Sequence, residues 1–141
     1  LSLGILEPPY TINLVLHTPT QGGQRGTPRN LFDMLQRLDE LPVPREELRV
    51  NVSSMGPTQL PITTIALAMG LNVRVGMEDN VYYRRGELLE NNAQLVERTA
   101  RIARELERRV ASPDEARGML GLRGRERGRL PAGAERAQTN R

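Results

Sequence analysis

Residues 72–80 read NVRVGMEDN, a short run that alternates apolar and polar side chains before it ends in charged and amide groups. Side chains two positions apart share a face of an extended chain, so this run predicts a strand. Its apolar face consists of Val73, Val75 and Met77. The opposite face carries Arg74, Gly76 and Glu78, and Asp79 follows directly. Buried charges are costly unless they are paired or bound, so the charged face indicates a functional or ion-paired site.

Two earlier runs are rich in β-branched and other apolar residues, namely TINLVLH at 11–17 and LRVNVSSM at 48–55. The first run is typical of a strand that is covered on both faces, as strands of parallel sheets are. Helical patterns separate the three runs. Thr27 and Pro28 are a good N-cap and a good first position for one helix, and LPITTIALAM at 60–69 predicts a second.

After the third run, RRGE at 84–87 predicts a turn, and Asn91 or Asn92 caps a long helix with an apolar stripe. Ser112 opens a short helix with a capping box. Strands that alternate with helices imply parallel strands joined by right-handed crossovers. We therefore predict an α/β fold with the three strands parallel and adjacent in chain order. Three such strands cannot close into a barrel, which indicates a part of a larger domain.

The composition excludes some classes of protein and of metal site. The 141 residues contain no cysteine, which excludes disulfides and thiolate metal sites, and no apolar run long enough for a membrane helix. We expect a cytoplasmic protein without a membrane partner. All 20 basic residues are arginine, and residues 123–141 hold six of them against two glutamates. This segment has no apolar periodicity and is predicted to be an arginine-rich disordered tail.

Several stretches match one known family in the same order along the chain. They are TINLVLH before a Gly-Gly loop and TPRNL, GPTQLP at 56–61, RVGMEDN at 74–80 followed by NAQLVERTARIA at 92–103, and ASPDEARGMLGL at 111–122. Through these motifs, residues 4–122 resemble the C-terminal portion of the beta-keto acid cleavage enzymes. Ordered matches are more specific than any one motif alone.

The resemblance implies a fold and an activity. Family members are (β/α)8 TIM-type barrels, so residues 1–122 would be the C-terminal part of such a barrel, with strands six to eight. They use a divalent metal, usually zinc, and transfer an acyl unit between a β-keto acid and acetyl-CoA. The products are a CoA ester and acetoacetate. We therefore expect a small-molecule β-keto acid and a CoA ester as partners, acetyl-CoA as co-substrate, and a homo-oligomer at full length.

The resemblance also assigns roles at the end of the third strand. Glu78 matches the carboxylate metal ligand, Asp79 the catalytic acid/base, and Arg74 the cationic partner of Asp79. Arg74 could instead form a buried structural bridge with Glu78. The family's two histidine ligands lie in a His-x-His pattern that this sequence lacks. Its one histidine, His17, ends the first strand, where a capping or loop role is more typical than a metal role.

Two further residues are weaker candidates for binding substrate or CoA. Gln59 follows the second strand, where the ordinary role of such a residue is to order its own loop. Arg25 lies in the glycine-rich loop after the first strand, and free backbone N–H groups there could approach a CoA phosphate. A mobile turn is the simpler interpretation of that loop.

Two other functions stay open at this point. The chain could be a catalytically inactive remnant or an assembly piece that completes another chain. It could also bind nucleic acid through its arginine-rich tail, although no aromatic residue lies between the arginines and we do not expect that partner. As an enzyme, the 141-residue fragment alone is predicted to be inactive, because the other metal ligands are not in its sequence.

Overall fold

The structure is a computed structural model that describes residues 7–18 and 22–122. The chain divides into two units, Leu1–Val110 and Ala111–Arg141. The tail predicted for residues 123–141 lies outside the described residues. Within the described ranges, no helix is both long and apolar enough to cross a membrane.

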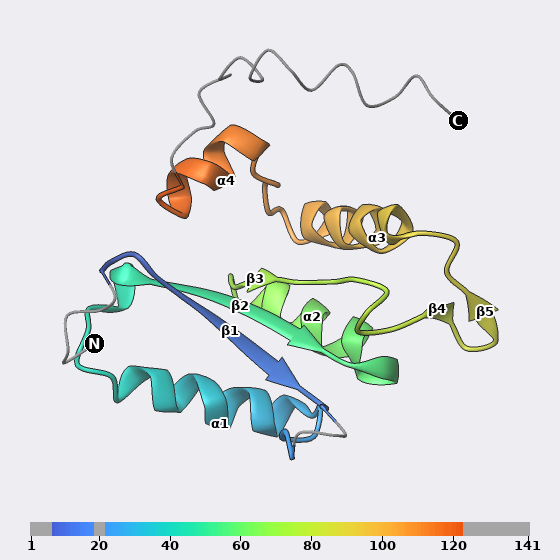
Figure 1. Cartoon of the computed structure of the whole chain (residues 1–141), viewed down its shortest axis with the longest axis horizontal. Coiled ribbons are helices and arrows are strands. Elements are labelled where there is room, and N and C mark those ends of the chain that lie inside the picture. Colours follow the sequence, from blue (N-terminus) through green and yellow to red (C-terminus); the bar gives the residue numbers. More distant parts are fainter. Residues whose placement is uncertain (1–6, 19–21, 123–141) are drawn as a thin grey trace, which may run out of the picture. The chain divides into compact units, whose positions relative to one another are not determined.

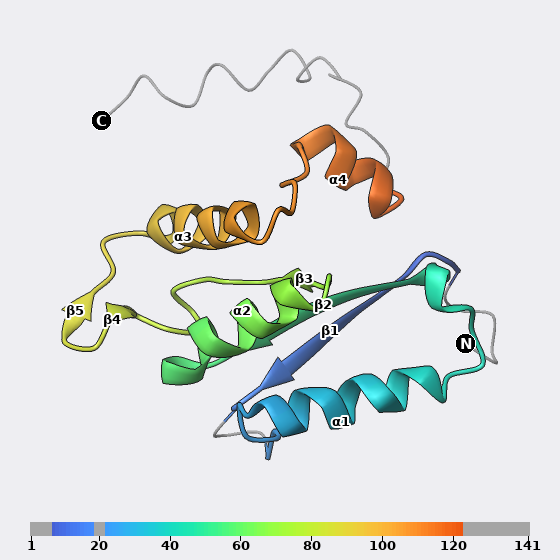
Figure 2. The same ribbon diagram turned by 180° about the vertical axis from the view of Figure 1, so that it is seen from behind.

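The main sheet consists of three parallel strands in chain order, as predicted. β1 (Tyr10–Leu16) pairs with β2 (Leu48–Ser54), and β2 pairs with β3 (Asn72–Val73). Figures 1 and 2 both show the two long strands side by side, with their arrows pointing the same way. Because the strands are parallel and adjacent, their C-terminal ends meet at one edge of the sheet.

β3 is shorter than the strand predicted for residues 72–78. It ends at Val73, although the Arg74 backbone N–H still donates to the Val52 carbonyl at 3.0 Å. The chain then turns, because the Gly76 carbonyl accepts hydrogen bonds from the backbone N–H groups three and four positions later. The alternating pattern of the sequence thus continues for several residues after strand pairing has stopped.

A short antiparallel hairpin follows, where the sequence predicts only a turn at 84–87. It consists of β4 (Tyr82–Arg84) and β5 (Glu87–Leu88). At its tip Gly86 has φ of 81°, a conformation that glycine adopts without steric cost. The predicted turn is therefore the tip of a hairpin whose strands are too short to give a periodic signal.

Two helices cover one face of the sheet and form the core with it. α1 (Pro28–Asp39) begins after Thr27, whose hydroxyl accepts a hydrogen bond from the Asn30 N–H at 3.2 Å, so the predicted N-cap is confirmed. α2 (Gln59–Ala68) covers the same face. Strand residues of one parity pack there against both helices, and the cluster is Leu14, Leu16, Leu31, Leu48, Val50, Val52, Ile62 and Ala66.

The remaining helices follow the hairpin. α3 (Asn92–Glu105) begins after Asn91, one of the two predicted caps. Beyond it, Arg108 ties the chain to the end of α2 by donating to the carbonyls of Leu67, Gly70 and Leu71 at 3.0, 3.0 and 2.7 Å. In the second unit, α4 (Pro113–Met119) has the predicted capping box at Ser112. Two short 3₁₀ helices precede β2 and α2, at Arg45–Glu47 and Gly56–Thr58.

The other face of the sheet is exposed around Thr11, Asn13 and Asn72 in the part of the chain that the structure describes, and it becomes buried only toward Ser53, near the C-terminal end of β2. Thr11 and Asn13 are exposed there, so the prediction that residues 11–17 are covered on both faces is wrong for this chain. Three asparagines lie in register across this face, with Asn51 between Asn13 and Asn72. Buried amides require hydrogen-bond partners, so this face is suited to water or to a polar neighbour rather than to an apolar core.

Leu31 and Phe32 provide a matched test of where the core lies. Leu31 is fully buried between helix and sheet, whereas its neighbour Phe32 is 50% exposed. We expect Leu31→Ala to lower the free energy of unfolding by about 2–5 kcal/mol, because it leaves a cavity in the core. Phe32→Ala should change it by less than about 1 kcal/mol. Urea unfolding followed by circular dichroism measures both, and equal losses would contradict the assigned core face.

Candidate functional site

The candidate site lies in the turn that follows β3, at the edge where the parallel strands end. The Gly76 carbonyl accepts from Asp79 N–H at 3.1 Å and from Asn80 N–H at 3.2 Å, which folds the chain back on itself. This turn brings Asp79 next to Arg74, although five positions separate them in the sequence. The carboxyl-terminal edge of parallel strands is where active sites of α/β proteins collect.

Arg74 holds the Asp79 carboxylate through two parallel hydrogen bonds. Arg74 Nη2 donates to Asp79 Oδ1 at 2.6 Å, and Arg74 Nε donates to Asp79 Oδ2 at 3.2 Å. The Asp79 side chain is only 1% exposed, whereas that of Arg74 is 44% exposed. Hydrogen bonding to Asp79 raises the pKa of Arg74 above its ordinary value, more than burial lowers it. The fork-to-carboxylate geometry is among the strongest side-chain pairings in proteins.

Glu78 lies beside this pair and remains accessible. Its side chain is 62% exposed, and its Oε1 lies 3.9 Å from Arg74 Nη2, which is a loose ion pair without a hydrogen bond. The carboxylate folds back over Gly76, where an added Cβ would lie only 2.0 Å from Glu78 Oε2. A larger residue at position 76 would therefore displace the Glu78 carboxylate from this position. The alternative prediction, a buried ion pair between Arg74 and Glu78, is therefore wrong.

Three other segments hold the turn in place. The Gly56 N–H donates to the Asp79 carbonyl at 2.7 Å, and the Gln59 side-chain amide donates to the Gly76 carbonyl at 3.2 Å. The Asn92 side-chain carbonyl, at the start of α3, accepts from the Met77 N–H at 2.7 Å. The turn is thus fixed from β3, from the start of α2 and from the start of α3.

The structure brings some of the predicted residues together and not others. Arg74, Glu78 and Asp79 form one cluster, and Gln59 contacts the backbone of the same turn. Gln59 is 1% exposed, and its Oε1 atom has no hydrogen-bond partner among the described residues. Its amide N–H bond to the Gly76 carbonyl gives it the role of positioning the turn. Arg25 is exposed in the loop after β1 and does not line the cavity beside the site.

His17 is not part of the cluster either. It directly follows β1 and has φ of 60°, and its backbone N–H donates to the Gln24 carbonyl at 2.6 Å. A left-handed residue at a strand end serves to turn the chain, which is the loop role that the sequence favours. His17 also does not line the cavity next to Glu78.

Ser53 is a residue that sequence reasoning did not select. Its hydroxyl is fully buried and has no hydrogen-bond partner among the described residues. It lies on β2, on the polar face that carries Asn51, and the pairing that joins Val52 to Val73 places it beside Arg74. A buried hydroxyl without a partner is unusual and costs free energy. The sequence pattern that could have identified Ser53 is its position two residues after Asn51, which places both side chains on the same face of the strand.

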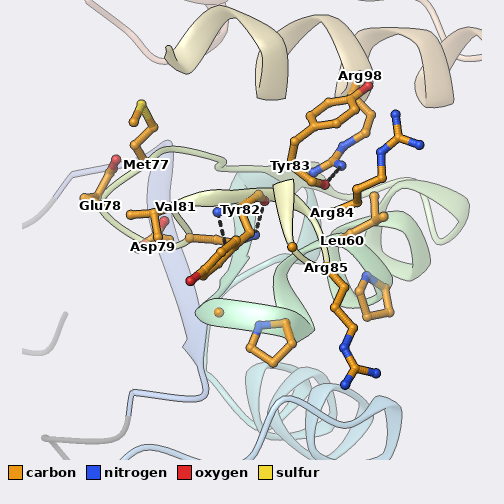
Figure 3. A pocket seen from close by; sticks show the side chains of 15 residues that line it. Leu60, Met77, Glu78, Asp79, Val81, Tyr82, Tyr83, Arg84, Arg85 and Arg98 are labelled. Atoms are coloured by element: carbon orange, nitrogen blue, oxygen red, sulfur yellow. Dashed lines mark hydrogen bonds between the residues drawn. The ribbon is translucent and has the colours of Figure 1, made fainter. Parts of the chain in front are cut away.

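A cavity of about 1040 Å³ opens beside the turn. Figure 3 shows Glu78 and Asp79 on one side of it and Arg84, Arg85 and Arg98 on the other. The lining residues come from the loop after β2, the start of α2, the turn, the hairpin and α3, and they are Gly56, Pro57, Leu60, Pro61, residues 77–86 and Arg98. The volume is that of a site for a small organic ligand.

The described residues offer a metal ion one suitable ligand side chain. No group of three or more histidine, cysteine, aspartate or glutamate side chains that could hold an ion exists in residues 7–18 and 22–122. Both oxygens of Asp79 accept from Arg74, whereas the exposed carboxylate of Glu78 has no hydrogen-bond donor within the described ranges. Glu78 therefore suits the role of a single carboxylate ligand, and these residues by themselves do not make a metal site.

Comparison with known proteins shows the family of this chain. The sequence profile of the beta-keto acid cleavage enzyme family matches residues 1–122, and the chain belongs to that family. It is 38% identical over 119 residues to the 3-keto-5-aminohexanoate cleavage enzyme of Acetoanaerobium sticklandii, and 49% identical over 72 residues to that of Fusobacterium nucleatum. It is 31% identical over 121 residues to the 3,5-dioxohexanoate:acetyl-CoA acetone transferase of Paraburkholderia graminis.

The chain covers only part of these relatives. The alignments span 84%, 51% and 86% of this chain but 41%, 26% and 38% of the respective relatives. The activity in the name of each relative therefore depends on a protein more than twice as long as the matched segment.

The paired carboxylate can be tested against an exposed ion pair of the same chain. Arg74→Met leaves the buried Asp79 carboxylate without its two donors, and we expect the free energy of unfolding to fall by about 2 kcal/mol or more. Arg84→Met breaks the pair with Glu87, whose side chains are 72% and 51% exposed, and should cost less than about 1 kcal/mol. Urea unfolding measures both. Equal effects would show that the Arg74 pair is not structurally important.

Proposed function

We propose that this chain contributes one part of the active site of an enzyme that condenses a β-keto acid with acetyl-CoA to give a CoA ester and acetoacetate. The observation that carries the proposal is the buried Asp79 carboxylate, held by Arg74 beside the accessible Glu78, in a chain of this family. A buried carboxylate in a fixed position next to a cavity is suited to moving a proton.

We propose further that β1, β2 and β3 are strands six to eight of a (β/α)8 barrel. Two features support this. The strands follow one another in chain order, and α1 and α2 cover the same face, whereas a doubly wound sheet carries helices on both faces. The opposite face, with its row of asparagines, would then line the interior of the barrel.

The proposed products determine which bonds must change. Acetoacetate contains the acetyl group together with C1 and C2 of the keto acid, so C2 forms a bond to the acetyl carbon and the C2–C3 bond breaks. The CoA thiolate that leaves the acetyl group takes over the remaining acyl unit. C2 must first lose a proton, which is acidic because C2 lies between two carbonyl groups.

Asp79 is the base that we assign to this proton transfer, and it returns the proton to C2 of acetoacetate after the C2–C3 bond breaks. Arg74 fixes both oxygens of Asp79, which keeps the base aimed at one place. Gln59 and Asn92 act as positioning residues, since each holds the backbone of the turn that carries the base.

We assign Glu78 as one ligand of a divalent metal, zinc by the family resemblance. A metal bound there would polarise the keto oxygen. The chain has one histidine and no cysteine, so the remaining ligands would come from outside these 141 residues.

Two conservative substitutions separate the roles of the neighbouring acids in the full-length protein. We expect Glu78→Gln to weaken zinc binding by at least tenfold, because a ligand charge is lost. Asp79→Asn should bind zinc as the parent does and lose turnover by about 10²- to 10⁴-fold, the range of general acid–base catalysis. Calorimetric zinc titration and an acetoacetate assay measure the two effects. Parental zinc affinity in Glu78→Gln would refute the ligand assignment.

The 141-residue chain alone provides a separate prediction. Glu78 is the one suitable ligand that the described part of the chain places at the site, and a catalytic zinc site needs about three protein ligands. We therefore expect zinc binding weaker than micromolar and no acetoacetate formation from a β-keto acid and acetyl-CoA. Measurable turnover by this chain alone would show that the site has been misplaced, while a full-length protein without acetyl-CoA-dependent turnover would favour an inactive remnant.

A further inference from the structure

We propose that the β4–β5 hairpin binds the phosphate groups of the CoA thioester, with Arg85 as the principal contact. The inference rests on the proposed function for the identity of the ligand. It differs from the prediction from sequence, which assigned a possible CoA contact to Arg25 and Gln59. Gln59 is buried and its amide is bonded to the Gly76 carbonyl, and Arg25 does not line the cavity.

The cavity has chemically different ends. Glu78 and Asp79 lie at one end, where the reaction is proposed, and three arginines line the other side (Figure 3). A CoA thioester has the same polarity, with a neutral reactive thioester at one end and phosphates at the other. The volume of about 1040 Å³ is at the upper end of ordinary ligand sites, which suits a long ligand.

Two of the three arginines are already engaged. Arg98 is 8% exposed, donates to the Tyr83 carbonyl, and stacks over the Tyr83 ring with its guanidinium carbon 4.5 Å from the ring centre. Burial lowers the pKa of Arg98 below its ordinary value, as expected for a cation that serves structure. Arg84 forms an ion pair with Glu87, with Nε and Oε2 2.7 Å apart.

Arg85 is the cation that remains. It is exposed at the tip of the hairpin and has no ion-pair partner in the described ranges. Arg98 joins the hairpin to α3 through its contacts with Tyr83, so Arg85 lies on a hairpin that is attached to a helix. A guanidinium with five free donors is well suited to bind phosphate oxygens.

Apart from its charged groups, the lining of the cavity includes several apolar side chains. Leu60, Val81 and Tyr82 line it, and their side chains are 39%, 47% and 48% exposed. The apolar lining matches the pantetheine arm of CoA, which is mostly uncharged. The cation beyond it matches the diphosphate that follows this arm. If β2 and β3 are strands seven and eight, this cavity also lies between the two loops that commonly bind phosphate in TIM barrels.

The test compares ligands that differ in their phosphates, in the full-length protein. Acetyl-CoA carries the phosphates, and S-acetylpantetheine carries the same reactive group without them. We expect Arg85→Gln to raise the KM for acetyl-CoA on the order of tenfold and to leave the KM for S-acetylpantetheine unchanged. Arg25→Gln, which removes the rival arginine, should leave both values as they are in the parent.

Direct binding separates this inference from the proposed function. Calorimetric titration with CoA itself needs no turnover, and we expect Arg85→Gln to bind CoA about tenfold more weakly than the parent. A parent that binds CoA in this way but makes no acetoacetate refutes the proposed reaction and supports the phosphate site. Unchanged CoA affinity in Arg85→Gln, equal losses for both thioesters, or a loss in Arg25→Gln instead would overturn the hairpin site.

Discussion

The fixed position of the Asp79 carboxylate depends on its two hydrogen bonds from Arg74, and the geometry of the site follows from that pair. Arg74 is placed by the sheet, since its backbone N–H still pairs with β2. The turn centred on the Gly76 carbonyl then brings Asp79 back to the guanidinium, while Glu78 stays exposed beside it. Two adjacent acids thereby acquire opposite environments, one buried and paired, the other open to solvent. A difference of this kind allows neighbouring carboxylates to serve different chemical roles.

Much of the fold could be predicted because its signals are local. Thr27 and Ser112 indicate helix starts because their own side chains cap the helices. The alternation of strands and helices predicts the parallel strand order that the sheet has. The clustering of Arg74 with Glu78 and Asp79 follows from strand parity together with the family resemblance. These residues lie within a few positions of one another, so little tertiary information was needed.

The features that sequence reasoning missed depend on contacts between distant positions. The bond from Gln59 to the Gly76 carbonyl spans 17 positions, and that from Arg98 to the Tyr83 carbonyl spans 15. In neither pair does the sequence around one residue indicate which distant residue it contacts. The early end of β3 has the same origin, because it is set by where the turn closes and not by the alternation of side chains. The prediction that residues 11–17 are covered on both faces failed because apolar character indicates burial in some final assembly without identifying the covering element.

The outer edge of β1 has a consequence for how this segment behaves by itself. β1 pairs with β2 on one side, and no strand of the described residues pairs with its other side. About every second residue of this seven-residue strand therefore points its backbone donor and acceptor away from β2, and these unused groups can template a strand from another molecule. The asparagines at 13, 51 and 72 add amide groups in register that stack readily on their own kind. In a closed barrel, a neighbouring strand would pair with this edge. In the free segment the same backbone groups can pair with another copy, so barrel closure and concentration-dependent self-association compete for them.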